Sequence, residues 1–422
     1  MIKQIKSYWF PVFFVLVIMA EMIFHAFMIA FNIKETSGQL QYLFMVIFSI
    51  SFFILIDDFG KIKRGFNNKR LITYLVLLVI LYWITQFFYN TQRNPNYITY
   101  LLTFGVKCIP AVIVGAHFMR NPTMYKIDKI LPFVILPVGL ILGVMGYEVA
   151  MSNSLVGRGD DDDGSGLNYQ IFAYYMAELY AYSAYYVFYS SARYKSKYRI
   201  LRLLVFFAML FFAAVCMLSG GRGAMVFIIV VSAYIVYSLN KTKRMSRIQL
   251  LIAIIAIGLI FAYIFTTLDI SNSLGYNRVI NNLTIDEERD ELSAKALYSI
   301  KNSIIIGHGL GSVWWEVGFY THNMFSDLLV ETGIFGTCIV GCVLWRMTYR
   351  LLKMSYNNNS FFFVLFMYFR ILLTTMLSGY WFGAYQLWIV YGMVMVLTES
   401  KFKEILKDLK KVQIGTEIKI LK

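Results

Sequence analysis

Long runs of apolar residues recur along the whole chain, and this repetition constrains the fold more than any other feature. About twelve runs approach the roughly 20 residues that an α-helix needs to cross the hydrocarbon core of a bilayer. Charged residues make up only 15% of the 422 residues and apolar residues 59%, which excludes a soluble enzyme, a disordered chain and a disulfide-rich secreted domain. We therefore predict an all-α polytopic membrane protein, with a single integral membrane domain over residues 1–422. The predicted spans are 8–31, 40–56, 71–89, 98–118, 130–150, 167–191, 200–218, 223–239, 248–268, 321–344, 360–378 and 381–398.

Lysine and arginine are unevenly distributed over the segments between these runs. An alternating set of segments that includes both chain ends carries 29 of the 39 basic residues. Basic loops are retained in the cytoplasm, so both termini are predicted to be cytoplasmic and the other set of loops to lie outside. The net charge of +15 is accounted for by these inner loops, and it implies no nucleic-acid partner.

The longest predicted outer loop, 269–320, separates the ninth and tenth spans. Within it, four apolar residues recur at helical spacing, and we expect a short amphipathic helix that lies on the membrane. These four are Leu292, Ala296, Ile300 and Ile304. Residues 401–422 form a second amphipathic segment, in which an apolar stripe runs among lysines. This cytoplasmic tail suits an anionic inner leaflet.

The first candidate site is the turn Ser219-Gly220-Gly221-Arg222-Gly223, at the outer end of the predicted seventh span. The eighth helix begins here, so its free N–H groups and its positive dipole end would surround Arg222. Glycines let a ligand approach the backbone closely, and arginine adds a forked donor, which together suit a phosphate or pyrophosphate. A tight turn whose arginine extends to the membrane surface is the alternative interpretation.

The second candidate is the pair His322 and Asn323, at the predicted outer start of the tenth span. The positive end of the helix dipole disfavours the imidazolium, which keeps His322 available as a base. A histidine that only caps the helix is the alternative.

An acidic stripe lies below this pair, because Asn323, Asp327 and Glu331 are spaced at i, i+4 and i+8 on one helical face. Two carboxylates inside a span are costly unless they are paired or solvated. We expect them to line a wet cavity, to orient the histidine, or to form an ion pair with Arg370 or Lys107.

Other polar residues within the spans are interpreted as packing residues. The isolated ones are Glu21, Glu178, His25 and His117, and the four cysteines (Cys108, Cys216, Cys338 and Cys342) are expected to be buried as small hydrophobic residues. The run Asp160-Asp161-Asp162-Asp163 lacks the alternating ligands of a calcium-binding loop and is interpreted as a solvated loop.

Taken together, these motifs resemble the O-antigen polymerase and O-antigen ligase family of bacterial surface-polysaccharide assembly, which resembles membrane-embedded glycosyltransferases of the GT-C type. The outer-loop signature of that family is a glycine-rich turn, then His-Asn at a helix start, then a glutamate and spaced glycines. It is matched by Gly307-His308-Gly309-Leu310-Gly311, His322-Asn323, Glu331, Gly333 and Gly336. The Ser-x-Gly-Arg turn of the family is matched by Ser219, Gly221 and Arg222, and Arg158 followed by Asn168 is similar to its Arg…Asn-Pro-Asn segment without the proline.

The resemblance implies glycosyl transfer at the outer face of the bacterial cytoplasmic (inner) membrane. The donor would be a glycan on undecaprenyl pyrophosphate, and the acceptor a hydroxyl of the next lipid-linked repeat unit of an O-antigen, capsule or exopolysaccharide. Arginines would neutralise the departing pyrophosphate, and His322 would deprotonate or orient the acceptor. The implied residues are, for catalysis, His322 and Glu331 and, for pyrophosphate or substrate binding, Arg222, Arg278, Arg289, Arg158 and Asn323.

The resemblance implies neither a metal nor a cofactor, and it implies a flippase and a chain-length regulator as partners in the bilayer. An O-antigen ligase, which would transfer the glycan to lipid A-core or to protein, stays open as an alternative. We favour the polymerase because an incomplete motif set is typical of that strongly divergent group. A polysaccharide flippase is the alternative from another class, although such a transporter needs no long outer loop with histidine and arginine gathered at one face.

Overall fold

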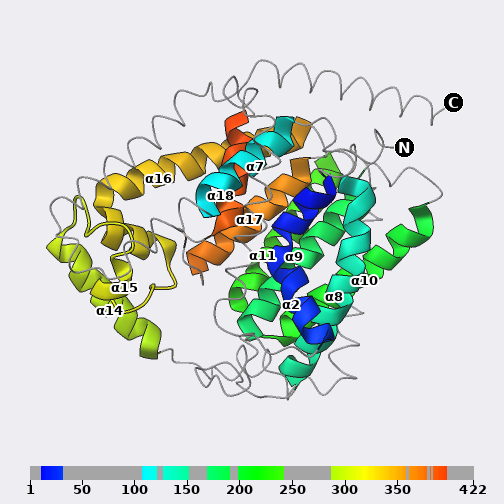
Figure 1. The fold of residues 1–422 in the computed structure, drawn as a ribbon, viewed down its shortest axis with the longest axis horizontal. Coiled ribbons are helices and arrows are strands. Elements are labelled where there is room, and N and C mark those ends of the chain that lie inside the picture. Colours follow the sequence, from blue (N-terminus) through cyan, green and yellow to red (C-terminus); the bar gives the residue numbers. More distant parts are fainter. Residues whose placement is uncertain are drawn as a thin grey trace. The chain divides into compact units, whose positions relative to one another are not determined.

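The computed structural model describes residues 11–31, 107–120, 127–151, 169–190, 198–241, 287–357, 361–377, 381 and 384–396, and every regular element among them is a helix (Figure 1). The predicted all-α class is therefore confirmed for this part of the chain. The helices belong to two compact units. One unit comprises Val15–Gln41 and Tyr125–Ile285, and the other comprises Met1–Phe14, Tyr42–Met124 and Asp286–Lys422. We call them the Arg222 unit and the His322 unit, after the candidate residue that each contains.

The Arg222 unit is built around a buried helix, α9. Its helices are α2 (Ala20–Ala30), α8 (Ile127–Met151), α9 (Tyr169–Phe188), α10 (Arg199–Leu218) and α11 (Arg222–Lys241). α9 packs against α8, α10 and α11, and nearly all of its described side chains are buried. A helix that is apolar around its whole circumference has no face that favours water, so it takes the central position.

Tyrosines of α9 place hydroxyl groups inside this unit, and these groups are satisfied by hydrogen bonds. Tyr182 donates to Glu178 (2.6 Å) and Tyr185 donates to Asp128 of α8 (2.7 Å). Tyr175 is hydrogen-bonded to His25 Nδ1 of α2 at 2.9 Å. His25 and Glu178 are thus buried, hydrogen-bonded packing residues, as the sequence predicted.

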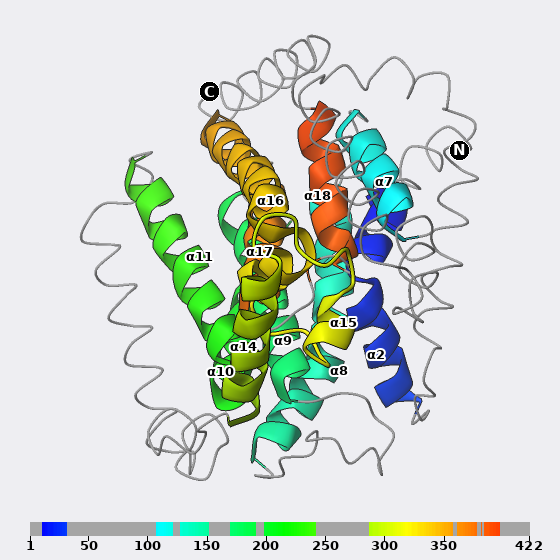
Figure 2. The same ribbon diagram turned by 90° about the vertical axis from the view of Figure 1, so that its left-hand side faces the viewer.

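The His322 unit contains the long helix α16 and the elements that pack on it. Its helices are α7 (Ile109–Arg120), α14 (Glu287–Asn302), α15 (Val313–Glu316), α16 (Met324–Asn357), α17 (Phe361–Leu377) and α18 (Tyr385–Val396). α16 contacts α14, α15, α17 and α18, and α7 packs on α18. Figure 2 shows α14 and α15 gathered at one end of α16.

α7 and α18 approach each other closely because each carries a glycine at the crossing. A Cβ atom at Gly115 would lie 1.9 Å from the carbonyl oxygen of Ile389, and one at Gly392 would lie 2.0 Å from that of Val112. Small residues at such crossings let helix backbones pack tightly inside a membrane, where no hydrophobic force drives helices together.

Among the described residues, four helices are long and apolar enough to cross a bilayer: Ile127–Met151, Arg199–Leu218, Arg222–Asn240 and Met324–Ser355. They confirm the helices predicted at 130–150, 200–218, 223–239 and 321–344. The first predicted span is bent, because Pro11–Ile18 and Ala20–Ala30 meet at 74°. α7, α9, α17 and α18 lie within the runs 98–118, 167–191, 360–378 and 381–398 or overlap them. The runs 40–56, 71–89 and 248–268, and the tail 401–422, lie outside the described residues.

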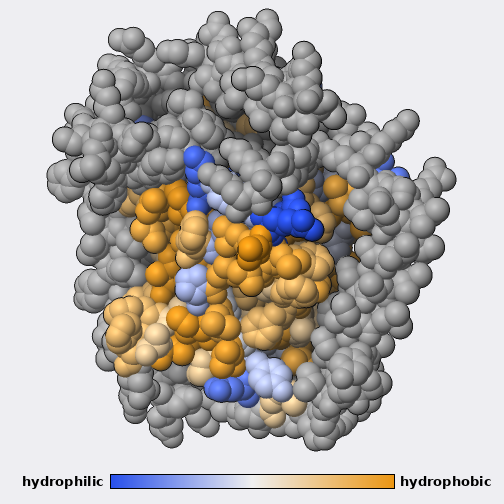
Figure 3. All heavy atoms as spheres, turned by 90° about the vertical axis from the view of Figure 1, so that its right-hand side faces the viewer, coloured by the Kyte–Doolittle hydropathy of each residue, from blue (hydrophilic) through white to orange (hydrophobic). Residues whose placement is uncertain are grey.

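Large apolar side chains remain exposed on the spanning helices. Phe133 and Leu140 of α8 are 67% and 62% exposed, and Phe207 of α10 is 58% exposed. Figure 3 shows such side chains gathered on one face of the molecule. An apolar patch of this kind is unusual on a soluble protein, whereas in a multi-pass membrane protein it is the surface that lipid covers.

Two expectations from the sequence are corrected by this fold. Cys108 and Cys216 are buried as predicted, but Cys338 and Cys342 are exposed on α16, because their side of the helix faces away from the packing partners. Three of the four residues of the predicted apolar stripe pack on protein, since Ala296, with Leu292 and Ile300, contacts a core formed with Val313, Val317 and Val330. The fourth, Ile304, follows the end of α14 and is 48% exposed.

The exposed side of α14 carries an ion pair. Lys295 Nζ lies 2.8 Å from Glu291 Oε1, one turn away. The hydrogen bond and the positive charge of Lys295 lower the pKa of the Glu291 carboxyl.

Candidate functional site

α16 is broken near its beginning, and this break organises the His322 unit. Gly333 has φ 61° and ψ −168°, which interrupts the helical backbone. At such a break the carbonyls of the preceding turn and the N–H groups of the following turn lose their intrahelical partners. Inside a membrane protein these groups need other partners, because an unpaired backbone group in a low dielectric is costly.

The glycine-rich segment after α14 supplies those partners. The N–H groups of His308 and Gly309 donate to the carbonyls of Val330 and Glu331, both at 2.8 Å. In return, the N–H groups of Ile334 and Phe335 donate to the carbonyls of Ile304 (2.9 Å) and Ile305 (3.1 Å). We call residues 304–309 the docking segment, because its backbone joins both sides of the break.

Two glycines of the predicted signature make this docking possible. Gly307 and Gly333 both have a positive φ. A Cβ atom at Gly333 would lie 2.3 Å from the carbonyl oxygen of Ile305, and one at Gly307 would lie 2.5 Å from the backbone of Glu331. Here, therefore, the signature glycines let one backbone approach another.

Glu331 is fully buried at the end of the first part of α16. Its Oε1 accepts the N–H of Gly311 at 2.9 Å, and its Oε2 accepts the indole N–H of Trp381 at 3.2 Å. Both carboxylate oxygens therefore bind neutral donors of the protein. These contacts fasten the glycine-rich loop and Trp381 to the broken helix.

His308 fastens the same loop to α14. Its ring Nε2 lies 2.9 Å from the carbonyl oxygen of Ser299, so this nitrogen carries the proton and donates it. Its Nδ1 lies 3.7 Å from Glu316 Oε1 of α15. His308 thus links the glycine-rich loop to α14 and α15, in addition to its backbone bond across the break.

His322 lies in the tight turn that leads into α16, and its backbone is strained. It is the only non-glycine residue with a positive φ (56°) among the described residues. A side chain in the left-handed region costs of order 1–3 kcal/mol and persists only where neighbouring contacts hold it. Strain of this kind is concentrated at functional positions.

The residues on either side of His322 are held by the first turn of α16. Asp327 Oδ1 accepts both the backbone N–H and the hydroxyl of Thr321, each at 2.8 Å. Asn323 Oδ1 accepts the N–H of Phe325 at 3.0 Å, which makes Asn323 the N-terminal cap of the helix. The helix start thereby fixes the backbone of His322 from both directions.

Asp327 is fully buried, and it does not form the ion pair with Arg370 or Lys107 that was one of the three alternatives. Its Oδ1 is bonded to Thr321 instead, and within the described part of the chain its Oδ2 has no hydrogen-bond partner. Arg370 donates to Gln386 of α18 at 2.6 Å, and Lys107 Nζ lies 5.7 Å from the ring centroid of Tyr385. Each of these two basic residues thus has a contact on α18 or at its start.

Aromatic rings surround His322. Its ring centroid lies 4.5 Å from that of Tyr320 and 5.8 Å from that of Phe319. Phe319 and Tyr320 in turn contact Trp314 of α15, at 5.1 and 5.6 Å. We call Trp314, Phe319 and Tyr320 the aromatic cluster. It was not identified from the sequence, although the pairs Trp314-Trp315 and Phe319-Tyr320 on the two sides of a turn could have indicated it.

The glycine turn around Arg222 begins α11 in the other unit. Gly220 has φ 73°, and a Cβ atom at Gly221 would lie 2.4 Å from Cβ of Ala173 in α9. Ser219 donates its hydroxyl to the carbonyl of Val215 at 2.7 Å. The local structure therefore explains why both positions are glycine. Arg222 is an exposed residue at the N-terminus of a helix.

The remaining predicted substrate-binding residues are placed only in part. Arg289 lies in the first turn of α14, whereas Arg158 and Arg278 lie outside the described residues. His322, Asn323 and Glu331 all lie between the N-terminal turn and the break of α16.

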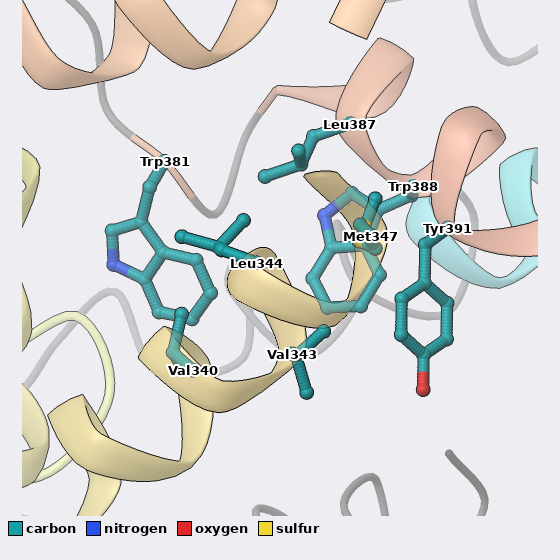
Figure 4. A pocket seen from close by; sticks show the side chains of 8 residues that line it. All are labelled: Val340, Val343, Leu344, Met347, Trp381, Leu387, Trp388 and Tyr391. Atoms are coloured by element: carbon teal, nitrogen blue, oxygen red, sulfur yellow. The ribbon is translucent and has the colours of Figure 1, made fainter. Parts of the chain in front are cut away.

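A small apolar groove, with a cavity volume of about 40 Å³, lies between the second part of α16 and α18 (Figure 4). It is lined by Val340, Val343, Leu344, Met347, Trp381, Leu387, Trp388 and Tyr391. No charged side chain is among these lining residues. Trp381 forms one end of the groove while its indole N–H binds Glu331, so the apolar lining is directly joined to the break.

These features combine an imidazole held in a strained turn, an adjacent carboxamide, exposed aromatic surface and an apolar groove. An imidazole can accept a proton from a hydroxyl group. Aromatic and apolar surfaces can hold the carbon skeleton of a substrate while a few polar groups orient it. The arrangement therefore suits proton transfer on an amphipathic molecule at a membrane.

Comparison with known protein families tests the resemblance noted in the sequence. The family model described as O-antigen ligase (Wzy_C) matches residues 207–341. The matched range begins in α10, contains the Arg222 turn, the docking segment, the His322 turn and the Gly333 break, and ends within α16. No curated protein matches the chain. The predicted resemblance is thus confirmed over this range, and the chain is a multi-pass membrane protein whose residues 207–341 match the O-antigen ligase family.

Proposed function

We propose that this protein polymerises lipid-linked oligosaccharide repeat units on the outer face of the bacterial cytoplasmic membrane. The donor is a growing glycan on undecaprenyl pyrophosphate, and the acceptor is a hydroxyl of the next lipid-linked repeat of an O-antigen, capsule or exopolysaccharide. The observation that carries the proposal is the turn of His322, a strained histidine held from both sides, within a segment that matches the O-antigen ligase family.

The proposed reaction is a direct displacement at the sugar. The acceptor oxygen forms a bond to the anomeric carbon of the donor while the bond from that carbon to the pyrophosphate oxygen breaks. The electron pair of the broken bond leaves with the pyrophosphate, and the proton of the acceptor hydroxyl passes to the imidazole of His322. Proton transfer of this kind contributes roughly 10²–10⁴-fold to a rate.

Positive charge near the leaving group makes the pyrophosphate a better leaving group. We assign this task to Arg222, which is exposed at the start of α11, with Arg278 or Arg289. Arg158 and Asn323 are assigned to substrate contact. Arginine is suited to pyrophosphate because its planar fork donates two parallel hydrogen bonds.

We assign Glu331 a positioning role. It was expected to act in catalysis, but both of its oxygens accept hydrogen bonds from the protein, from Gly311 and Trp381. A carboxylate held in this way keeps the glycine-rich loop and the broken helix together. It therefore supports the His322 turn through the backbone.

The apolar groove is assigned to the isoprenoid chain of the carrier lipid. Its lining consists of aliphatic side chains, methionine and aromatic rings. Such a lining favours a branched hydrocarbon over a charged or glycan group. Trp381 connects this groove to Glu331, and hence the lipid-binding surface to the outer loop.

An O-antigen ligase is the second candidate, because the matched family carries that description. The chemistry is the same, but the acceptor is lipid A-core or a protein. A flippase, the alternative from a different class, does not use a catalytic base. The polymerase would work beside a flippase and a chain-length regulator.

Deletion of the gene in its host, followed by analysis of surface glycans, distinguishes these functions. A polymerase deletion leaves single repeats at the surface, and a ligase deletion leaves long glycans on the lipid carrier. A flippase deletion retains lipid-linked repeats inside the cell. Long, attached glycans in the deletion strain would reject all three functions.

A further inference from the structure

The aromatic cluster beside His322 has one ring that is partly exposed. Trp314 and Tyr320 are partly buried on the core formed by Ala296, Val313 and Val330. Phe319 is 39% exposed, and the preceding Gly318 is also exposed, with open space around it. Phe319 therefore presents exposed aromatic surface at the edge of a cluster whose other two rings pack on the core.

This free surface adjoins the proposed base. The ring centroid of Phe319 lies 5.8 Å from that of His322, about the distance between two stacked or tilted rings. A six-membered sugar ring has a face of C–H groups and a rim of hydroxyls. Such a C–H face packs on aromatic rings while the hydroxyls bind polar groups nearby.

A polar donor lies on the other side of His322. The oxygen of the Asn323 carboxamide faces the backbone N–H groups of Phe325 and Ser326, which fixes the orientation of the amide. The amide nitrogen therefore points away from the helix start, and the residue is exposed. The amide N–H₂ can thus donate to a sugar hydroxyl.

From this arrangement we propose that Phe319, backed by Trp314 and Tyr320, is the stacking platform for the acceptor sugar, the ring whose hydroxyl is deprotonated at His322. The inference rests on the proposed function and adds a substrate contact to it. Phe319 binds the C–H face of the sugar and Asn323 binds a hydroxyl on its rim. The platform thereby orients one hydroxyl toward the imidazole, which favours a single linkage.

Aromatic residues also anchor proteins at the membrane surface, and the test must separate this role from stacking. Leucine replaces phenylalanine well in contact with lipid but offers no flat ring. The informative variant is therefore Phe319→Leu, with Phe319→Trp as the variant that retains a ring. The matched control is Tyr298→Leu, because Tyr298 of α14 is an aromatic residue that is 71% exposed in the same unit.

The assay uses purified full-length protein in liposomes with lipid-linked repeat units extracted from the deletion strain. Free repeat-unit oligosaccharide, released from its carrier by mild acid, is the varied acceptor. We expect Phe319→Leu to raise the acceptor KM about tenfold, equivalent to about 1.4 kcal/mol, with the donor KM unchanged. Phe319→Trp, which retains a ring, should raise the acceptor KM less than Phe319→Leu does, and Tyr298→Leu should keep the wild-type acceptor KM.

A binding measurement accompanies the kinetics. A photoreactive phenylalanine at position 319 should cross-link to the lipid-linked repeats, and the same group at position 298 should not. A wild-type acceptor KM in Phe319→Leu, or equal cross-linking at both positions, would overturn the platform. Failure of the wild-type protein to extend any repeat would instead reject the proposed function.

Discussion

The broken helix α16 leads to a prediction whose size follows from the structure. In Gly333→Ala, the new Cβ atom would lie 2.3 Å from the carbonyl oxygen and 2.4 Å from the carbonyl carbon of Ile305, and 2.6 Å from the nitrogen of Ile306. All three are backbone atoms, so no side-chain rotation can relieve the overlap. The docking segment 304–309 must move away from the break.

The free-energy cost has two parts. An alanine at the φ of 61° and ψ of −168° of Gly333, a region occupied almost only by glycine, costs about 1–3 kcal/mol. Moving the docking segment away breaks the four backbone hydrogen bonds across the break, at about 1 kcal/mol each. We therefore expect Gly333→Ala to lose about 5–7 kcal/mol of stability in this unit.

Gly318→Ala is the matched control, because Gly318 also has a positive φ (94°) but no atom lies within 4 Å of the position that a Cβ atom would take there. Its stability should fall only by the cost of the backbone strain, about 1–2 kcal/mol. Thermal unfolding of the detergent-solubilised variants measures the difference. Hydrogen exchange at the amides of His308, Gly309, Ile334 and Phe335 then reports whether the segment has moved. Equal melting temperatures for the two variants, with all four amides still protected, would refute the docking argument.

Substitutions at four further positions test the site. Arg222→Lys keeps the charge but loses the fork, so glycan chains should shorten sharply at normal protein abundance; wild-type chain length would leave Arg222 as a turn residue. Glu331→Gln replaces one carboxylate oxygen by an N–H₂ group that cannot accept a hydrogen bond, so one N–H donor of the protein loses its acceptor. The protein should lose about 1–3 kcal/mol of stability and become less abundant. Adding Trp381→Phe removes the indole donor and should restore part of the lost stability, as measured by thermal unfolding. Asp327→Asn keeps an oxygen acceptor for Thr321 and should elongate chains normally, whereas Asp327→Ala should lose about 1–3 kcal/mol of stability.

Features that depend on hydrophobic periodicity could be predicted from the sequence. The helices α8, α10 and α11 occupy the predicted apolar runs, because burial of an apolar segment in lipid depends on its length and composition. The start of α16 at His322-Asn323 was also predicted, and Asn323 acts as its cap. An N-terminal cap is a hydrogen bond between residues close in sequence, so it can be predicted from a short stretch of the chain.

Features that depend on contacts between distant segments could not be predicted. The sequence indicated a glycine-rich turn at 307–311, but not that its glycines would allow backbone docking on Glu331 and Gly333, more than 20 residues away. The stripe of α14 was assigned to lipid because periodicity shows that a face is apolar without showing what it packs on. The partner of Asp327 proved to be Thr321, a neutral residue that a search for opposite charges does not find.

The central claim is that His322 accepts the proton of an acceptor hydroxyl during glycosyl transfer. The most direct measurement is chain growth on extracted lipid-linked repeats in liposomes, with wild type, His322→Ala and His117→Ala compared at equal protein levels. His117, in α7, is the control for the loss of a histidine elsewhere. We predict that His322→Ala binds the donor as wild type does but elongates roughly 10²–10⁴-fold more slowly, while His117→Ala keeps the wild-type rate. A His322→Ala protein that elongates chains at the wild-type rate would contradict the account.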